Sequence, residues 1–543
     1  MASIRLPQYA TASERVTRGL NLAEQRDRYA WVHAPGLPPW CRGIPEGEAF
    51  SRSKGLRFRT KLGTTAASLL LTVEARLLTR PATLADYDRY YTLLTKPDVM
   101  TRWRDDDEFA RQRVNGIYPN LIRRIQEIPD NFPVTEAVVA PVLRDRGLTL
   151  EALLKEGRLY LSDYAILEGI PCTPGRFQVA PMALLYVDQH RQLLPLAIQL
   201  GQSPATAPVI FTPKDPTWLW RLAKAFVQCA DGTVHEVAAH LVRTHLAMEP
   251  VWVAANRTLP PQHPIHVLLR PHFTDTLQIN QDARDVMLAP GGPIDEAIAV
   301  GAEGSFVLAA RAWERWDFDA CDPQACFDRR DVNDLPGYYY REDALALWAA
   351  IGTYACELVT GIYREDRQVR ADTELQAFVR ELQSSSGGQL RGVPGAGAGM
   401  QTMDQLIRLL RLVLWTVSAE HSAVNNGQYD QLGYVPNTPG AMYVPPPTTK
   451  DAVSEATFAY ALPLPDAVAQ QITMVNLLSL PTLLPLGRYG QTFFQGVPEV
   501  QLAVDRFRAR MSDIGRRIDA RNKRLRVPYS YLHPARVGRS IDI

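Results

Sequence analysis

Histidines are concentrated in one stretch of the chain, because six of the ten lie between His235 and His272. Three of them, His235, His240 and His245, recur every five residues, and Thr233–Glu236 has the capping-box pattern of a helix start. On an ideal α-helix, five residues turn about 500°, which leaves His240 and His245 about 140° apart. One ion could bind both only if the helix widened locally to i to i+5 bonding. The spacing therefore predicts either a widened helix with a shared ion or core histidines that are bonded separately.

A second polar pair lies on a helix expected over residues 403–425. His421 and Asn425 continue, in steps of four, an apolar stripe of Leu406, Leu409, Leu410, Val413 and Val417. Both side chains should therefore point into the core. Because a buried polar group without a partner costs a few kcal/mol, the two must bond each other or bind a ligand.

Imidazoles combined with an amide or carboxylate oxygen suit iron, manganese, copper or zinc. More than three donors would be unlike an open catalytic zinc site, which favours redox chemistry. The stretch HEVAAH (235–240) leaves a competing hypothesis, a zinc hydrolase that uses His235, Glu236 and His240. Its histidines are one residue too far apart for the HExxH motif. A lipid-binding or scaffold protein without metal is a third possibility.

The composition is that of an ordinary globular protein. The chain has 543 residues, of which 46% are hydrophobic and 22% charged, and this excludes wholesale disorder. Fifty-nine Lys and Arg against 58 Asp and Glu leave a net charge of +1, so we expect no nucleic-acid partner. The six cysteines form no CxxC pair and the N-terminus shows no signal-peptide pattern, which predicts reduced thiols and a cytoplasmic location.

The fold class expected from the periodicity is mainly α, with a small antiparallel β subregion. Helical spacing dominates from Trp218 onward, whereas 182–187 and 193–200 read as a β-hairpin around DQHRQ. The other expected features are a helix over 11–29, a helix packed on the core over 505–526, a buried helix within 467–487 and a loop over 384–399. The apolar run AASLLLTVEARLL (66–78) is expected to pack in the core, with lipid contact as the alternative.

Several stretches together resemble the lipoxygenase family of non-haem iron dioxygenases. The two histidine-bearing stretches are similar to that family's two ligand helices. Further matches are RWRDDDEFARQRVNGIYPNLIRR (102–124), LYLSDYAILEGIP (159–171), YYYREDALALW (338–348), VPPPTTKDA (444–452) and RNKRLRVPYSYLHP (521–534). The resemblance implies one large helical catalytic domain over 96–543. It leaves 1–95 as a helical extension in place of the family's N-terminal β-barrel, as in a compact bacterial-type enzyme.

The resemblance also implies a set of site residues. The metal ligands would be His240, His245, His421, Asn425 and the main-chain carboxylate of Ile543. Glu236 and Gln428 match positions that link a ligand to the substrate pocket by hydrogen bonds. Ala283, Met287, Ile294, Gly232 and Met474 match pocket positions, for all of which except Ala283 ordinary helix packing is an equal explanation.

The function implied by the resemblance is dioxygenation of polyunsaturated fatty acids such as linoleate and arachidonate. A ferric hydroxide would remove a hydrogen atom from the cis,cis-1,4-pentadiene, and O2 would add to give a conjugated hydroperoxide. Alanine at position 283 implies the S configuration. A hydroperoxide isomerase or epoxyalcohol synthase and a manganese-dependent variant stay open. We expect one iron per chain, a monomer, and at most transient contact with a membrane surface.

Overall fold

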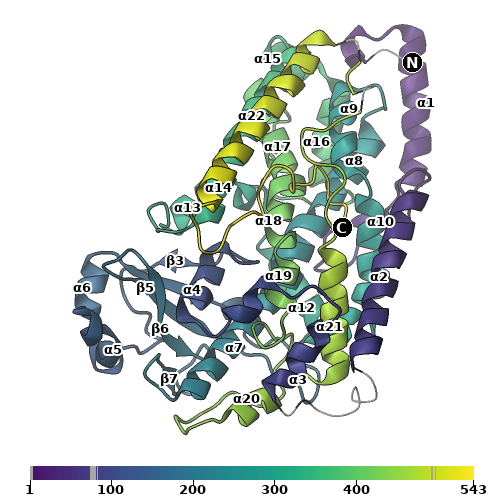
Figure 1. The fold of residues 1–543 in the computed structure, drawn as a ribbon. Coiled ribbons are helices and arrows are strands. Elements are labelled where there is room, and N and C mark those ends of the chain that lie inside the picture. The colour runs from purple at the N-terminus through teal and green to yellow at the C-terminus, as the bar shows by residue number, and fades with distance from the viewer. Residues whose placement is uncertain (1–3, 74–80, 82, 491–492, 496) are drawn as a thin grey trace.

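The computed structural model describes residues 4–73, 81, 83–490, 493–495 and 497–543. Figure 1 shows a tall body of helices with a small sheet region set to one side, at the lower left. The C-terminus lies inside the helical body, whereas α1 (Ala12–Arg28) lies at its edge. The predicted mainly helical class with a small β subregion is confirmed.

The sheet has five antiparallel strands in the order β3-β4-β5-β6-β7. Their bounds are Arg123–Arg124, Leu159–Asp163, Met182–Val187, Leu193–Gln199 and Ile210–Phe211. The predicted hairpin is β5 and β6, and Asp188 Oδ1 closes its turn by accepting from the backbone N–H groups of His190 and Gln192, both at 2.9 Å. The short helices α5 (Glu136–Leu143) and α6 (Leu150–Lys155) lie beside this sheet (Figure 1).

One continuous helical rod carries the histidine-rich stretch. It consists of α7 (Thr217–Val234), a π-helical segment (His235–Leu246) and α8 (Ala247–Thr258). The helix start predicted at Thr233 is wrong, because α7 already begins at Thr217 and the Thr233 hydroxyl donates to Gln178 Oε1 at 2.8 Å. The predicted widening of the helix is confirmed over His235–Leu246.

A second rod carries His421. It consists of α17 (Met403–Trp415), a π-helical segment (Thr416–Glu420) and α18 (His421–Asn425), as predicted for residues 403–425. Thr402 and Gln405 form a capping box at its start, which satisfies two backbone donors of the first turn. The predicted apolar stripe is buried, and so are His421 and Asn425.

A long helix packs on the second rod, and a further long helix packs on that one. The helix α14 (Tyr339–Ile362) packs against both α17 and α22 (Pro498–Asn522). Its length and composition would suit a membrane span, yet it is a helix of this packed body. The stacked rings of Tyr354 and Phe507, 4.3 Å apart, join α14 to α22. The prediction that the 505–526 helix packs on the core is confirmed, because its apolar positions Phe507, Met511, Ile514 and Ile518 are buried.

The helices near the N-terminus differ in part from expectation. The predicted first helix is α1, and α2 (Arg52–Val73) follows it along the same edge of the molecule (Figure 1). The prediction that residues 66–78 pack in the core is confirmed for Leu69. It is wrong for Leu70 and Leu71, which are 65% and 70% exposed. Residues 74–78 lie outside the described part of the chain. The domain boundary at residue 95 stays a prediction.

The remaining α-helices and a π-helical turn precede, connect or follow these two rods along the chain. They are α3 (Leu84–Asp88), α4 (Asp106–Asn115), α9 (Pro264–Leu269), α10 (Thr276–Asp282), a π-helical turn (Ala283–Met287), α11 (Pro293–Ala297), α12 (Gly301–Glu314), α13 (Pro323–Arg329), α15 (Asp366–Ala371), α16 (Thr373–Gln383), α19 (Gln428–Leu432), α20 (Glu455–Ala461) and α21 (Pro465–Leu478). The predicted helix within 467–487 is α21, and 384–399 is a loop as predicted.

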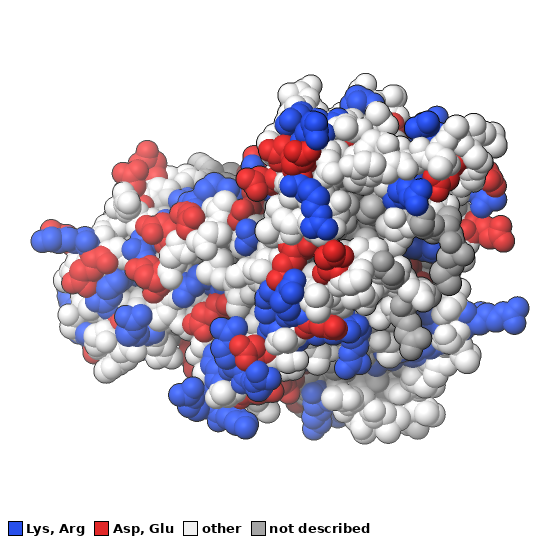
Figure 2. Space-filling model, turned by 90° about the horizontal axis from the view of Figure 1, so that it is seen from above, with Lys and Arg blue, Asp and Glu red and all other residues white. Residues whose placement is uncertain are grey.

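Surface charge is mixed. On the face seen in Figure 2, Lys and Arg side chains alternate with Asp and Glu side chains, and neither sign covers a large area. This distribution agrees with the net charge of +1. All six cysteines are free thiols, as predicted.

Candidate metal centre

Three histidines from the two rods meet in the core. The Nε2 atoms of His245 and His421 lie 3.1 Å apart, those of His240 and His245 3.2 Å, and those of His240 and His421 3.4 Å. All three rings are buried. Among the described residues, these three form the group that could hold a metal ion, because each offers one nitrogen toward a common point.

The π-helical widening allows His240 and His245 to face the same point. An α-helix would place these rings on different sides, whereas the wider turn brings their centroids within 4.8 Å. The hydroxyl of Thr244 donates to the carbonyl of His240, and in the second rod Ser418 donates to the carbonyl of Leu414. Both bonds run back four residues, a contact that bends helices and satisfies carbonyls at such irregular turns.

Asn280 on α10 holds His245, and sequence reasoning missed it. Its Oδ1 lies 3.0 Å from His245 Nδ1, while its Nδ2 donates to the His245 carbonyl and to Glu249 Oε2. Because Oδ1 can only accept, His245 carries its proton on Nδ1 and presents a lone pair on Nε2. This lone pair on Nε2 is available to bind a cation. Nothing local marks Asn280, which lies 35 residues beyond His245.

His235 does not join the group. Its Nε2 lies 2.7 Å from the carbonyl oxygen of Val424, and its Nδ1 lies 3.7 Å from Glu236 Oε1. The zinc hydrolase hypothesis needs His235 and His240 on one ion, so this geometry speaks against it. Glu236 lies between the two rings, with Oε2 3.8 Å from His240 Nδ1.

Asn425 and Gln428 lie at the end of the second rod. Gln428 Nε2 donates to Asn425 Oδ1 at 2.8 Å, and both side chains are buried. Gln428 is therefore hydrogen-bonded to a candidate ligand, and its predicted link from that ligand to the substrate pocket stays a prediction. The Oε1 atom of Gln428 is buried and has no hydrogen-bond partner among the described residues.

The C-terminal tail reaches the histidines from the far end of the chain. Ile541 and Ile543 are buried, and the backbone N–H of Gly538 donates to Ser422 Oγ, next to His421, at 3.1 Å. Burial lowers the pKa of His421 well below its usual value, and a hydrogen bond to the backbone of Ile543 opposes that shift. The last residue therefore contacts a histidine of the group.

An ion pair between a partly exposed arginine and a buried glutamate joins the two rods beside the histidines. Arg243, between His240 and His245, contacts the carboxylate of Glu420, which precedes His421. The guanidinium also donates to the carbonyl of Ala320. Sequence reasoning missed this pair, since the two residues are 177 positions apart and only the fold brings them together.

Burial keeps the three imidazoles neutral. Desolvation lowers the pKa of His240 to about 4, and it lowers the pKa values of His245 and His421 well below the usual value. Neutral imidazole is the form that binds metals. The same desolvation raises the pKa of Glu236.

The predicted pocket residues occupy buried or half-buried positions on neighbouring elements. Ala283 and Met287 are on the π-helical turn, which packs on α11 with Ile294, and α11 packs on α21 with Met474. Gly232 lies on α7, where an added methyl would come within 3.2 Å of both Leu432 and Thr438. Close helix packing explains this glycine, and the pocket roles of all five residues stay predictions.

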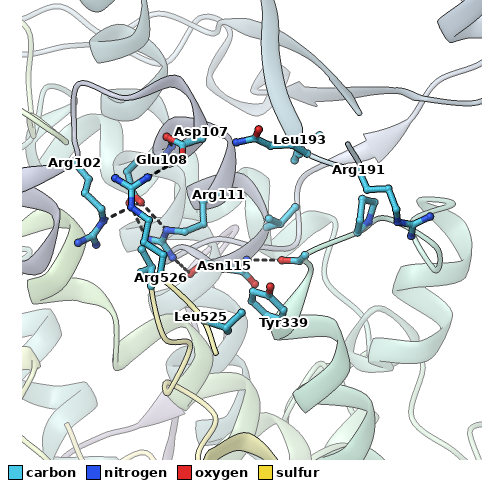
Figure 3. A pocket seen from close by; sticks show the side chains of 15 residues that line it. Arg102, Asp107, Glu108, Arg111, Asn115, Arg191, Leu193, Tyr339, Leu525 and Arg526 are labelled. Atoms are coloured by element: carbon cyan, nitrogen blue, oxygen red, sulfur yellow. Dashed lines mark hydrogen bonds and ion pairs between the residues drawn. The ribbon is translucent and has the colours of Figure 1, made fainter. Parts of the chain in front are cut away.

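A surface cavity of about 250 Å³ lies apart from the histidines. Arg102, Glu108 and Arg111 line it together with Tyr339 and Arg526 (Figure 3). The carboxylate of Glu108 forms ion pairs with Arg111 at 2.7 Å and with Arg102 at 3.4 Å. None of the three histidines lines this cavity.

Comparison with known proteins places this arrangement in a family. The family model for lipoxygenase matches residues 63–529. The chain belongs to the lipoxygenase family. Polyunsaturated fatty acid lipoxygenase ALOX8 of Mus musculus is 38% identical over 456 residues, which cover 82% of this chain but only 66% of that lipoxygenase. Polyunsaturated fatty acid lipoxygenase ALOX15B of Homo sapiens is 35% identical over 96% of this chain and 79% of its own length.

Solved lipoxygenase structures share the fold. A calcium-dependent 11R-lipoxygenase superposes with a TM-score of 0.92 at 31% identity, covering all of this chain and 83% of its own. A lipoxygenase crystallised anaerobically in complex with arachidonate gives a TM-score of 0.94 at 29% identity, with 84% of that chain covered. The expectation of a lipoxygenase-type catalytic fold is thus confirmed.

The lowered histidine pKa values predict that metal binding tolerates mild acid. Three histidines of ordinary pKa, near 6.5, would lose about 50-fold in metal affinity between pH 7.5 and 6.0 through proton competition. With the pKa of His240 at about 4 and those of His245 and His421 well below the ordinary value, proton competition is negligible in that range. We therefore expect the affinity for cobalt(II), measured by spectroscopic titration of the chelator-treated protein, to change by less than about twofold between pH 7.5 and 6.0. A loss of cobalt affinity by tens of fold would contradict the conclusion that the three imidazoles are buried and neutral.

Proposed function

We propose that this chain is an iron-dependent dioxygenase that converts polyunsaturated fatty acids containing a cis,cis-1,4-pentadiene to conjugated hydroperoxides. The observation that carries the proposal is the meeting of three neutral imidazole nitrogens with the buried C-terminus. Membership of the lipoxygenase family supports the same activity. Two of the relatives are polyunsaturated fatty acid lipoxygenases by name, which supports the substrate class.

His240, His245 and His421 would hold the iron, with the carboxylate of Ile543 as a charged oxygen donor and Asn425 as a weaker one. Bound iron would supply the one-electron redox chemistry that fatty acid oxygenation by O2 requires. The chain's own residues orient the donors: Asn280 fixes the tautomer of His245, and Gln428 holds the amide of Asn425. Burial of all these donors keeps bulk water away from the reacting lipid.

The C-terminus gives the direct test. A residue added after Ile543 would move the terminal carboxylate away from the buried position next to His421. We expect the unmodified chain to hold about one iron and to give conjugated-diene absorbance with linoleate or arachidonate. A short C-terminal extension should lower iron content and rate at least tenfold, in the range that loss of a ligand contact produces. An N-terminal extension of equal length is the control.

Each alternative has its own result in that experiment. Manganese in place of iron would indicate the metal variant, and turnover of added hydroperoxides to epoxyalcohols without dienes would indicate a hydroperoxide isomerase. Hydroperoxide isomerase ALOXE3 of Homo sapiens, 35% identical over 82% of this chain, makes that outcome worth measuring. Zinc with no diene formation, or full activity in the C-terminally extended chain, would contradict the proposal.

Ala283 supports an S hydroperoxide as the product. The residue is buried on the π-helical turn, where its methyl group would shield one end of the pentadiene from O2. We expect Ala283→Gly to shift the product toward R, as measured by chiral chromatography of the reduced products. Ala297→Gly, a buried alanine on α11, is the control. An unchanged chiral profile in Ala283→Gly would remove Ala283 from this role.

The helix α2 supports transient contact with an anionic membrane surface. Leu56, Leu70 and Leu71 are 61%, 65% and 70% exposed, and helical geometry places them within about 100° of one another on one face. Arg52, Arg57 and Arg59 lie within about 100° of Leu56 around the same helix, which carries no acidic residue. Exposed leucines with surrounding positive charge are typical of helices that lie on anionic lipid.

Vesicle sedimentation tests this contact. The double substitution Leu70→Ser and Leu71→Ser should reduce binding to phosphatidylserine-containing vesicles several-fold, since each exposed leucine contributes apolar area that lipid can cover. Leu502→Ser is the matched control, because Leu502 is 56% exposed on α22, away from α2 (Figure 1). Equal binding of the double variant and the control would contradict a lipid-facing α2.

A further inference from the structure

The last residues of the chain are held by side chains from three distant segments. Thr276, at the start of α10, donates to the carbonyl of Ile541 at 3.2 Å. Thr482 donates to Asp542 Oδ2 at 3.2 Å. Lys54, from the first turn of α2, donates to the backbone carbonyl of Asp542. The contact from Lys54 is the one directed at the peptide bond that precedes Ile543.

Lys54 is placed for this contact by its position on α2. Helical geometry puts it about 160° from Leu56, so it points inward while the leucine points outward. Only 15% of its side chain is exposed, and its ammonium lies 2.8 Å from the carboxylate of Asp275. The rings of Phe50 and Phe58 lie 5.0 and 5.7 Å from the same ammonium. A lysine enclosed in this way has few rotamers to lose when it binds the tail.

The charges around Lys54 indicate why its contact stabilises the C-terminal tail. The carboxylates of Asp275 and Asp542, each 12% exposed, and the terminal carboxylate lie in the same part of the core. Arg539 also faces Asp275 and Asp542, but its guanidinium donates to the carbonyl of Arg488. Removal of one partner from a buried charge cluster leaves the others unpaired, which is strongly destabilising locally. Without Lys54 the tail would lose the ammonium that pairs with Asp275 and Asp542, which would leave Arg539 to face both carboxylates.

The geometry of the peptide bond carries the effect to the last residue. The carbonyl of Asp542 belongs to the planar group that includes the nitrogen of Ile543. A donor that fixes this carbonyl fixes the plane and restricts the directions in which the terminal carboxylate can point. That carboxylate is the charged oxygen donor of the proposed iron site, next to His421.

We propose that Lys54 is a positioning residue that holds the C-terminal tail so that the carboxylate of Ile543 faces the three histidines. The proposal rests on the proposed function for the role of the carboxylate, but the restraint of the tail can be measured without metal. Lys54 lies before the stretch of the chain, residues 63–529, that matches the family model.

Release of Ile543 by carboxypeptidase Y tests the restraint. The experiment uses the full-length chain, both as purified and after chelation, with release followed by mass spectrometry. We expect Lys54→Met to release Ile543 at least tenfold faster than the unmodified chain in both states. It should also weaken iron binding at least tenfold and lower kcat more than it changes KM. Lys54→Arg, which keeps the charge, should restore part of the protection.

Lys61→Met is the matched control, because Lys61 lies on the same helix and no ion pair joins it to another described residue. It should leave release of Ile543 and iron content unchanged. Equal release from Lys54→Met and the unmodified chain would overturn the proposal, as would equal acceleration by Lys61→Met. The unmodified chain could also bind no iron while Lys54 still protects Ile543 from release. That result would contradict the proposed function but not the role of Lys54, so failure of one proposal can be told from failure of the other.

Discussion

The five-residue separation of His240 and His245 is the constraint on which the site depends. In a regular α-helix the two rings would face different sides, so the rod must widen to π geometry wherever both are to reach one point. The structure has this widening over His235–Leu246, and a second π-helical segment precedes His421. Each π-helical segment interrupts the regular backbone hydrogen bonds of its rod. The side-chain hydroxyls of Thr244 and Ser418 donate to backbone carbonyls in or just before these segments.

Polar contacts between distant segments hold the histidines in this arrangement. Asn280 binds the outer nitrogen of His245, and the Arg243–Glu420 pair joins the two rods directly beside the candidate ligands. Glu420 is buried and Arg243 only partly exposed, and a buried charge is tolerated only when it is paired, so the loss of one partner is costly. The same chemistry that stabilises the rods therefore sets the orientation of the donors, so metal geometry and fold stability depend on the same bonds.

Periodicity located the main elements because each long helix buries one face. The stripe from Leu406 to Val417 predicted the second rod and the inward position of His421, and the alternation around DQHRQ predicted the β5–β6 hairpin. Local patterns failed where tertiary context overrode them. The capping-box letters at Thr233 lie inside a helix that began at Thr217, and Leu70 is exposed although its sequence neighbours are apolar.

The sequence by itself determined which donor types exist and how they are spaced along each helix, because helical periodicity is a local property of the chain. It also predicted that the helix must widen if both rings are to meet at one ion, and it left separately bonded histidines as the alternative. Only the tertiary structure decided that His235 faces Val424 instead of the histidine group, that Asn280 and Glu420 support the site, and that Lys54 binds the tail. These contacts join residues tens to hundreds of positions apart, and their partners are set by the packing of whole helices.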